Sequence, residues 1–367
     1  MPTALRGWGS KMAERFERLT SAMRLSQHEG VLLHNPSNMF YISGYTGEGL
    51  VLVALNARAV VTDFRYTEQA ENQARGFSVE MTEKGRSSED VVAALCRRYD
   101  LDTLYYEDDY LTVHAFEALR DTVRGMEWKP VGGIPEQLRE VKDEHELSLI
   151  AQACKVTSEA FERVLSMFAE GVTEKEIALA LDFDMMRHGA SGCAFSTIVA
   201  AGANGSLPHA VPGDYKLCKG DLITMDFGAR VGGYCADMTR TVALGKPSSQ
   251  MQKVYETVLE AQKRSQAAVM AGRGCREIDA IARDYIDSNG YEGRFGHGLG
   301  HCLGIDIHES PRFNQVSTAT LKPNQVITVE PGCYLPGIGG VRIENTVVVK
   351  DNGCEVLTTP TRELLIL

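Results

Sequence analysis

Two stretches of the chain match position by position and decide the fold: Leu-Ile-Thr-Met-Asp-Phe-Gly at 222–228 and Val-Ile-Thr-Val-Glu-Pro-Gly at 326–332. Each reads as an apolar β-strand that carries a threonine and a carboxylate on one face and then turns at a glycine. Glu176-Ile177 and Glu277-Ile278 match upstream in the same way. Two copies at this long period exclude a solenoid, so we predict a duplicated half-domain with pseudo-two-fold symmetry.

Each copy supplies two acidic residues to the duplicated strands. Asp226 and Glu330 lie near the end of the first strand, and Asp237 and Glu344 lie in the strand that follows. A single acid in a strand is typical of a solvated face, but four at repeat-related positions would repel one another strongly if buried together. Two divalent cations would neutralise them, and carboxylate-bridged metal pairs are a known hydrolytic device.

Four of the nine histidines lie close to these acids in the sequence. His297 and His301 belong to the glycine-rich run Gly-His-Gly-Leu-Gly-His, and His209 and His308 flank it at greater distance. One imidazole is a reasonable ligand beside four carboxylates, because imidazole suits first-row metals. So hard and oxygen-rich a site favours Mn²⁺ over thiolate-bound zinc, with Co²⁺, Fe²⁺ or Zn²⁺ as alternatives.

Composition excludes several classes of function. The 367 residues carry a formal net charge of −11, which argues against binding a nucleic-acid backbone. No apolar stretch reaches the 18 residues of a membrane span, and the N-terminus has no signal-peptide core. Nine cysteines without a C-x-x-C pair indicate reduced thiols. We therefore expect a cytoplasmic protein with neither nucleic-acid nor membrane partners.

The chain divides into two predicted domains. Residues 1–132 alternate helix and strand, as in an α/β domain, and include a strand-like run at Phe40–Ser43. Gly132–Pro135 is the expected boundary, and the second domain covers 136–367. A charged segment beginning at Arg139 is expected to open a long helix that ends near Phe168.

At these residues the sequence resembles the pita-bread-fold metallopeptidases, in the branch of aminopeptidase P and prolidase. The stretches Asn35–Gly44 and Thr62–Thr67 resemble the creatinase-type N-terminal domain, and the duplicated part resembles the pita-bread catalytic domain. The resemblance covers nearly the whole chain. It implies an α/β two-domain fold, a creatinase-like domain followed by a catalytic domain of duplicated α+β halves.

The resemblance also implies a set of ligands for two divalent metal ions. Asp226 matches a ligand of one metal, while His301 and Glu330 match ligands of the other. Asp237 and Glu344 match carboxylates that bridge the pair. All five positions hold the residue type that the family pattern expects.

Further roles follow from the same resemblance. His209 matches a histidine near the scissile amide, and His308 matches one that steadies the tetrahedral species. Glu330 is a candidate proton shuttle. The positions expected to line the pocket for proline are His297, Tyr334 and Arg342.

The function implied is hydrolysis of the bond between an N-terminal residue and a following proline, as in a compact bacterial-type Xaa-Pro aminopeptidase. The expected partners are small peptides with proline at the second position, and the expected assembly is a homodimer. Three alternatives remain open at this point. They are an Xaa-Pro dipeptidase (prolidase), a metal-free creatinase-type amidinohydrolase, and a non-catalytic pita-bread module that binds peptides.

Overall fold

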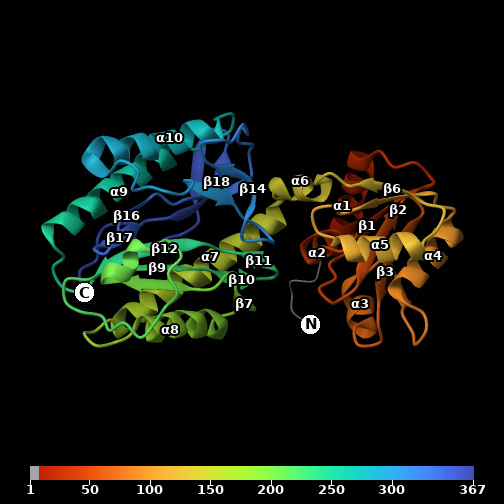
Figure 1. Ribbon diagram of the computed structural model, residues 1–367, viewed down its shortest axis with the longest axis horizontal. Helices are drawn as coiled ribbons and strands as arrows, with labels where there is room; N and C mark the ends of the chain where they lie inside the picture. The colour runs from red at the N-terminus through yellow and green to blue at the C-terminus, as the bar shows by residue number, and fades with distance from the viewer. Residues whose placement is uncertain (1–7) are drawn as a thin grey trace. The chain divides into compact units, whose positions relative to one another are not determined.

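The computed structural model describes residues 8–367 and divides into two compact units, one ending at Arg139 and the other spanning Glu140–Leu367 (Figure 1). None of the helices in the described range is both long and apolar enough to span a bilayer. The unit that begins at Glu140 contains all the residues singled out above as candidate ligands and catalytic groups.

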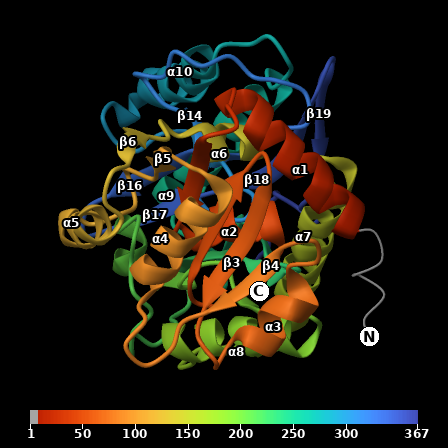
Figure 2. The ribbon, with the colours of Figure 1, turned by 90° about the vertical axis from the view of Figure 1, so that its right-hand side faces the viewer.

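The first unit is a six-stranded mixed sheet, in the order β4-β3-β2-β1-β5-β6, with helices on both faces. Strand β2 is buried along its whole length. Leu50, Leu52 and Ala54 pack in one apolar cluster with helix α4, and α1 contacts the strand as well. Figure 2 shows this unit toward the viewer, with α1 and α4 on either side of β3. Its elements are α1 Trp8–Met23, β1 Glu29–Leu33, α2 Pro36–Ser43, β2 Leu50–Ala54, β3 Ala57–Thr62, α3 Thr67–Gln73, β4 Ser78–Met81, α4 Ser88–Tyr99, β5 Thr103–Tyr106, α5 Val113–Thr122, β6 Glu127–Pro130 and α6 Ile134–Glu140.

The strand predicted at Phe40–Ser43 is wrong, because these residues form the end of helix α2. Asn35 caps this helix by accepting a hydrogen bond from the Ser37 amide, and Pro36 occupies its first turn. Gly44 then ends the helix in the left-handed region, at φ 77°. The local capping chemistry outweighs the apolar run that suggested a strand.

The second unit repeats one order of elements twice, as the duplicated motifs predict. The first copy contains α7 Glu144–Val164, η2 Leu165–Met167, α8 Glu174–Arg187, β7 Gly192–Cys193, β8 Ile198–Ala201, η3 Gly202–Ser206, β9 Leu222–Phe227, β10 Ala229–Val231, β11 Tyr234–Cys235 and β12 Met238–Ala243. The second contains α9 Ser249–Ala267, α10 Cys275–Ile286, η4 Asp287–Tyr291, β13 Gly300–Cys302, β14 Glu309–Phe313, β15 Val326–Val329, β16 Gly332–Leu335, β17 Gly339–Arg342, β18 Asn345–Lys350 and β19 Gly353–Val356.

The two copies build equivalent antiparallel sheets. In the first, β9 lies between β8 and β12, and in the second β15 lies between β13 and β18. Helices α8 and α10 lie on opposite sides of these strands in Figures 1 and 2. Met225 and Phe227 of β9 pack in the apolar cluster under α7 and α8, and Ile327 and Val329 of β15 pack under α9 and α10. The opposite face of each strand is thereby left for polar residues.

The helix expected from Arg139 to Phe168 is divided in two. Helix α6 ends at Glu140, and α7 begins at Glu144. Asp143 causes the break, because its side chain accepts hydrogen bonds from the His145 and Glu146 amides and so caps a new helix. The charged segment that suggested one continuous helix is a capping box at the start of α7.

Candidate metal centre

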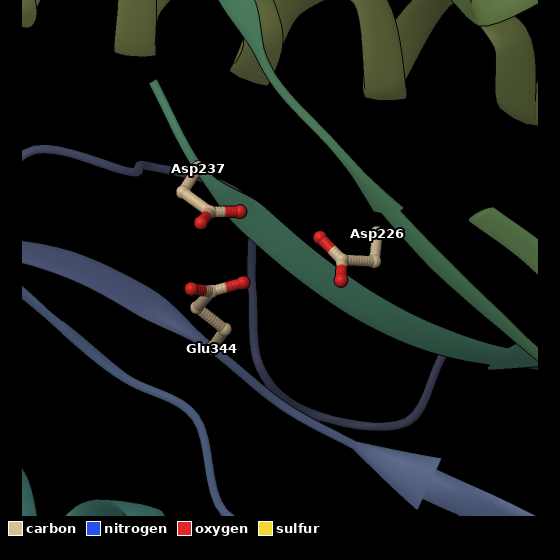
Figure 3. Close-up of side chains that lie close together, drawn as sticks. All are labelled: Asp226, Asp237 and Glu344. Carbon is tan, nitrogen blue, oxygen red and sulfur yellow. The ribbon is translucent and has the colours of Figure 1, made fainter. Parts of the chain in front are cut away.

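Three carboxylates from the two copies of the repeat meet at the polar face of the strands. Asp226 lies on β9, Asp237 directly before β12, and Glu344 directly before β18. One ligand oxygen of each lies within 4.8 Å of the others. Figure 3 shows the three side chains pointing toward one another. The local sequence explains this convergence, since Asp226 lies near the C-terminal end of one buried strand and Asp237 and Glu344 immediately precede two others.

Asp237 and Glu344 are buried, and two oxygens of the three acids lack a hydrogen-bond donor. Asp237 is 5% exposed and Glu344 is 1% exposed. Among residues 8–367, Asp226 Oδ1 and Glu344 Oε1 are buried without a hydrogen-bond donor. Burial first, and then the neighbouring negative charges, raises the pKa of both Asp237 and Glu344 well above the usual value. In the absence of cations, the folded chain therefore disfavours ionising these groups.

The fourth acid, Glu330, adjoins this cluster together with His301. The Glu330 Oε1 atom lies 3.4 Å from His301 Nε2, and Asp237 Oδ2 lies 3.5 Å from the same nitrogen. Burial raises the pKa of Glu330 to about 8. Burial, followed by electrostatic repulsion from His308, lowers the pKa of His301 to about 3, so its imidazole is neutral.

The arrangement around His301 fits a metal ligand. Its Nδ1 lies 3.1 Å from the Cys302 carbonyl oxygen, which calls for a proton on Nδ1. The Nε2 lone pair then faces the oxygens of Asp237 and Glu330, and no proton lies between them once both acids are ionised. Lone pairs that converge in this way repel one another unless a cation lies among them. A carbonyl oxygen bonded to the other ring nitrogen, as that of Cys302 is here, is the usual contact that orients a metal-binding imidazole. The donor set of four carboxylates and one imidazole thus suits divalent ions.

Hydroxyl groups orient two of the acids. Thr239 Oγ1 donates to Glu344 Oε2 at 2.8 Å, and Thr328 Oγ1 donates to Glu330 Oε1 at 3.0 Å. Thr224, which shares the face of Asp226, is instead 2.9 Å from the Thr241 hydroxyl. The Thr239 hydroxyl holds Glu344 Oε2 and leaves Oε1 without a donor, whereas the Glu330 oxygen held by Thr328 is the one that faces His301.

Arg342 is the cation nearest to the acids. Its Nη2 donates to Asp226 Oδ2 at 2.6 Å, and its Nη1 donates to the Tyr334 hydroxyl at 2.9 Å. The Tyr334 hydroxyl lies 2.9 Å from His297 Nε2. The three residues expected to line a proline pocket therefore form one connected group. Burial lowers the pKa of His297 to about 4, so this imidazole is also neutral.

A cavity of about 590 Å³ opens beside the acids. The two remaining predicted histidines, His209 and His308, both line it. The rings of His308 and His301 meet edge to face, with centroids 4.4 Å apart. All ten residues predicted for the site thus lie at the acidic cluster or around the cavity that opens from it.

Sequence reasoning missed one charged residue of this cavity, Arg312. It lies on β14 opposite His301 in the β13–β14 ladder and lines the cavity with its side chain exposed. Within residues 8–367 no carboxylate or carbonyl pairs with its guanidinium. Its position one strand away from a ligand becomes visible only once the strand pairing is known.

Comparison with known proteins agrees with this fold and site. Residues 148–351 match metallopeptidase family M24, and residues 15–141 match the creatinase/prolidase N-terminal domain. The fold and the acidic site define a metallopeptidase with a pita-bread catalytic domain. The chain belongs to metallopeptidase family M24, in the group that contains prolidases and X-Pro aminopeptidases. This confirms the resemblance drawn from the sequence.

Several relatives are similar over nearly their full length. An Xaa-Pro dipeptidase of Pyrococcus furiosus is 36% identical, with 96% of this chain and all of that protein covered. The structure of an Xaa-Pro dipeptidase from Bacillus anthracis is 40% identical with a TM-score of 0.93, covering 97% of this chain and 100% of the other. An X-Pro aminopeptidase structure from Thermotoga maritima is 37% identical with a TM-score of 0.88, covering 95% and 100%.

Proposed function

We propose that this chain is a dinuclear metal-dependent Xaa-Pro peptidase that removes the N-terminal residue of short peptides whose second residue is proline. The observation that carries the proposal is the convergence of Asp226, Asp237 and Glu344, with ligand oxygens within 4.8 Å and no cationic partner for two of the buried oxygens. In the proposed site the two ions would be held by Asp226, Asp237, His301, Glu330 and Glu344. When bound, the ions supply a water of lowered pKa and polarise the scissile carbonyl.

The side chains of the cavity would perform the remaining tasks. His209 and His308 both face the cavity and would donate hydrogen bonds to the oxyanion of the tetrahedral species. Glu330 would carry a proton to the leaving nitrogen of proline. His297, Tyr334 and Arg342 would form the wall against the proline ring.

The proposal is tested by activity after metal removal. Protein dialysed against a chelator should hydrolyse Ala-Pro and Ala-Pro-Ala at less than a hundredth of the metal-loaded rate, and Mn²⁺ or Co²⁺ should restore it. Ala-Ala should be a poor substrate throughout. Asp237→Asn should lose both metals, as measured by elemental analysis, because it removes a shared ligand. Full activity in chelator, or two metals and a normal rate in this variant, would refute the proposal.

A second candidate, the Xaa-Pro dipeptidase, is favoured by Arg312. In a dipeptide the carboxylate sits directly on the proline, and an exposed guanidinium without an intramolecular partner lines the same cavity. Such a pair would raise the affinity for dipeptides. Arg312→Met should then lower kcat/KM for Ala-Pro by about tenfold or more and leave Ala-Pro-Ala unchanged. Arg273→Met, which removes an arginine outside the cavity, is the matched control. If Arg312→Met changes kcat/KM equally for both peptides, the dipeptidase proposal is contradicted and the aminopeptidase proposal stands.

Three further properties belong to this proposal. We propose Mn²⁺ as the native metal, which elemental analysis of protein purified without added metal would test. We propose a homodimer, which light scattering of the purified chain would test. We propose a cytoplasmic location, supported by nine cysteines that are all free in the structure. Export of the chain by its native cell, measured on fractionated cells, would contradict the last of these.

A further inference from the structure

Helix α8 begins with two glutamates that behave differently. Glu176 closes a capping box with Thr173 and remains exposed. Glu174 points into the protein and is only 1% exposed. Within residues 8–367 no lysine, arginine or histidine forms an ion pair with Glu174. The proposed mechanism does not use this buried acid, and it lies outside the metal cluster.

The Glu174 carboxylate instead holds both ends of one loop. Its Oε1 accepts hydrogen bonds from the Ala201 amide at 2.7 Å and from Asn204 Nδ2 at 3.0 Å. Its Oε2 accepts from the Gly213 amide at 3.1 Å. The loop 202–212 between these anchors carries five consecutive residues that line the cavity, with His209 among them. One side chain therefore fixes where the loop leaves β8 and where it returns.

Only a carboxylate can make this set of contacts. Each of its two oxygens accepts hydrogen bonds, so it can receive amide N–H groups from both ends of the loop at once. A glutamine of the same shape would turn an NH₂ group toward one of those N–H donors and lose that anchor. Hydrogen bonds to a charged acceptor are roughly twice as strong as neutral ones, and the first turn of a helix favours negative charge.

The middle of the loop has two other contacts, and both tie it to the site. Arg342 Nη1 donates to the Pro208 carbonyl oxygen at 3.1 Å. Gly205 and Gly340 approach so closely that a Cβ on Gly340 would lie 2.0 Å from the Gly205 carbonyl oxygen. Without the Glu174 carboxylate these contacts would hold the near side of the loop, and Gly213 would keep the hydrogen bond that its carbonyl oxygen accepts from the Lys175 amide at 3.1 Å but lose the one that its own amide donates to Glu174.

We propose that Glu174 is a positioning residue, which sets the place of His209 against the substrate by clamping loop 202–212. The role of His209 in this statement rests on the proposed function, while the clamping of the loop does not. A misplacement of about 1 Å at a reacting group can cost on the order of 10²-fold in rate. We therefore expect Glu174→Gln to lower kcat by 10- to 100-fold with a smaller change in KM.

The matched control is Glu176→Gln, the same substitution in the same turn of the same helix. It removes the charge but keeps an oxygen that can accept from the Thr173 amide, and it should leave kcat within twofold of the original. Both variants are compared as full chains loaded with Mn²⁺, using Ala-Pro as the substrate. Metal content and thermal midpoint are measured for each. Loss of kcat in both variants in proportion to their loss of stability would overturn the proposal.

A double-mutant cycle separates positioning from ordinary structural damage. If Glu174 acts through His209, Glu174→Gln should cost less than threefold in a His209→Ala background, although it costs at least tenfold alone. Equal costs in both backgrounds would overturn the proposal. Asn204→Ala removes a single contact to Oε1 and provides a milder variant, for which we expect a three- to tenfold fall in kcat. If Glu174→Gln does not fold and Asn204→Ala has a normal kcat, the proposal that Glu174 positions loop 202–212 is contradicted.

Hydrogen exchange of the metal-loaded protein tests the clamp without any substrate. Amides of residues 202–213 should exchange at least tenfold faster in Glu174→Gln and at the original rate in Glu176→Gln. Unchanged exchange would overturn the proposal even if activity fell. If the original chain hydrolyses none of the Xaa-Pro peptides, the proposed function fails, and the exchange measurement still decides whether Glu174 holds the loop.

Discussion

Removing the metals should make the folded protein lose stability as the pH rises. Burial raises the pKa of Glu330 to about 8, whereas a glutamate in the unfolded chain ionises near 4.5. Between these values the folded chain keeps a proton that the unfolded chain has released. Each pH unit in this window therefore lowers the free energy of unfolding by about 1.4 kcal/mol for this one group.

The magnitude follows from that slope. From pH 5 to pH 8, Glu330 alone would remove about 4 kcal/mol. For a unit of this size each kcal/mol shifts the midpoint by about 2–4 °C, so the metal-free Tm should fall on the order of 10 °C. Asp237 and Glu344 have raised pKa values and act in the same direction. With Mn²⁺ bound, the carboxylates are ionised and neutralised, so the stabilisation by metal should grow with pH.

Calorimetry of chelator-dialysed protein at pH 5, 6, 7 and 8, with and without Mn²⁺, measures this effect. Glu330→Gln is the control, because a glutamine does not titrate and its metal-free Tm should fall less steeply. A metal-free Tm that is level or rises over this range, with the variant following the same curve, would refute the reasoning.

Three other substitutions probe buried contacts. Arg342→Lys should lower kcat/KM by about 10²-fold in peptide assays, because an ammonium cannot donate as a fork to Asp226 and its other acceptors; an unchanged rate would contradict this. Lys142→Met removes the cation that lies 2.9 Å from the buried carboxylate of Glu309, and it should lower the free energy of unfolding in urea by about 3–5 kcal/mol. A loss below 1 kcal/mol would contradict the expectation that Glu309 is left as an uncompensated buried charge. Burial lowers the pKa of His34 to about 4 in the folded chain. As the pH falls from 6.5 to 4, the unfolded chain therefore protonates this histidine before the folded chain does, and the free energy of unfolding decreases. His34→Asn should reduce that acid-induced drop in Tm, and identical slopes would count against it.

The acids of the site could be read from the sequence because their signal is local and repeated. Asp226 and Glu330 each end an apolar strand two residues after a threonine, and the match between the two copies marks them out from ordinary surface acids. The pairing of β9 with β12 and of β15 with β18 then follows from the duplicated pattern. The convergence of Asp226, Asp237 and Glu344 therefore follows from one short-range rule that applies twice.

Other features depend on contacts between residues far apart in the chain. The Thr173-x-x-Glu176 spacing marks Glu176 as a capping residue, but nothing in the sequence around Glu174 indicates that this acid is buried. Only the return of the chain at Gly213 shows which one is buried. Arg312 can likewise be identified as a cavity residue only when the pairing of β14 with the strand of His301 is known. The error at Phe40–Ser43 was of a different kind, because the capping residues Asn35 and Gly44 were already visible in the sequence and were outweighed by an apolar run.

The division of the acids between the two copies has a consequence for the origin of such a site. Asp226 and Asp237 come from one half and Glu330 and Glu344 from the other, and the Glu344 amide donates to the Thr239 carbonyl across the boundary. A half alone would hold only two of the four charges. An ancestral single-copy chain would have completed the ring by pairing with a second molecule, with one ion on each side of the symmetry axis. Gene fusion would then have freed the two halves to diverge.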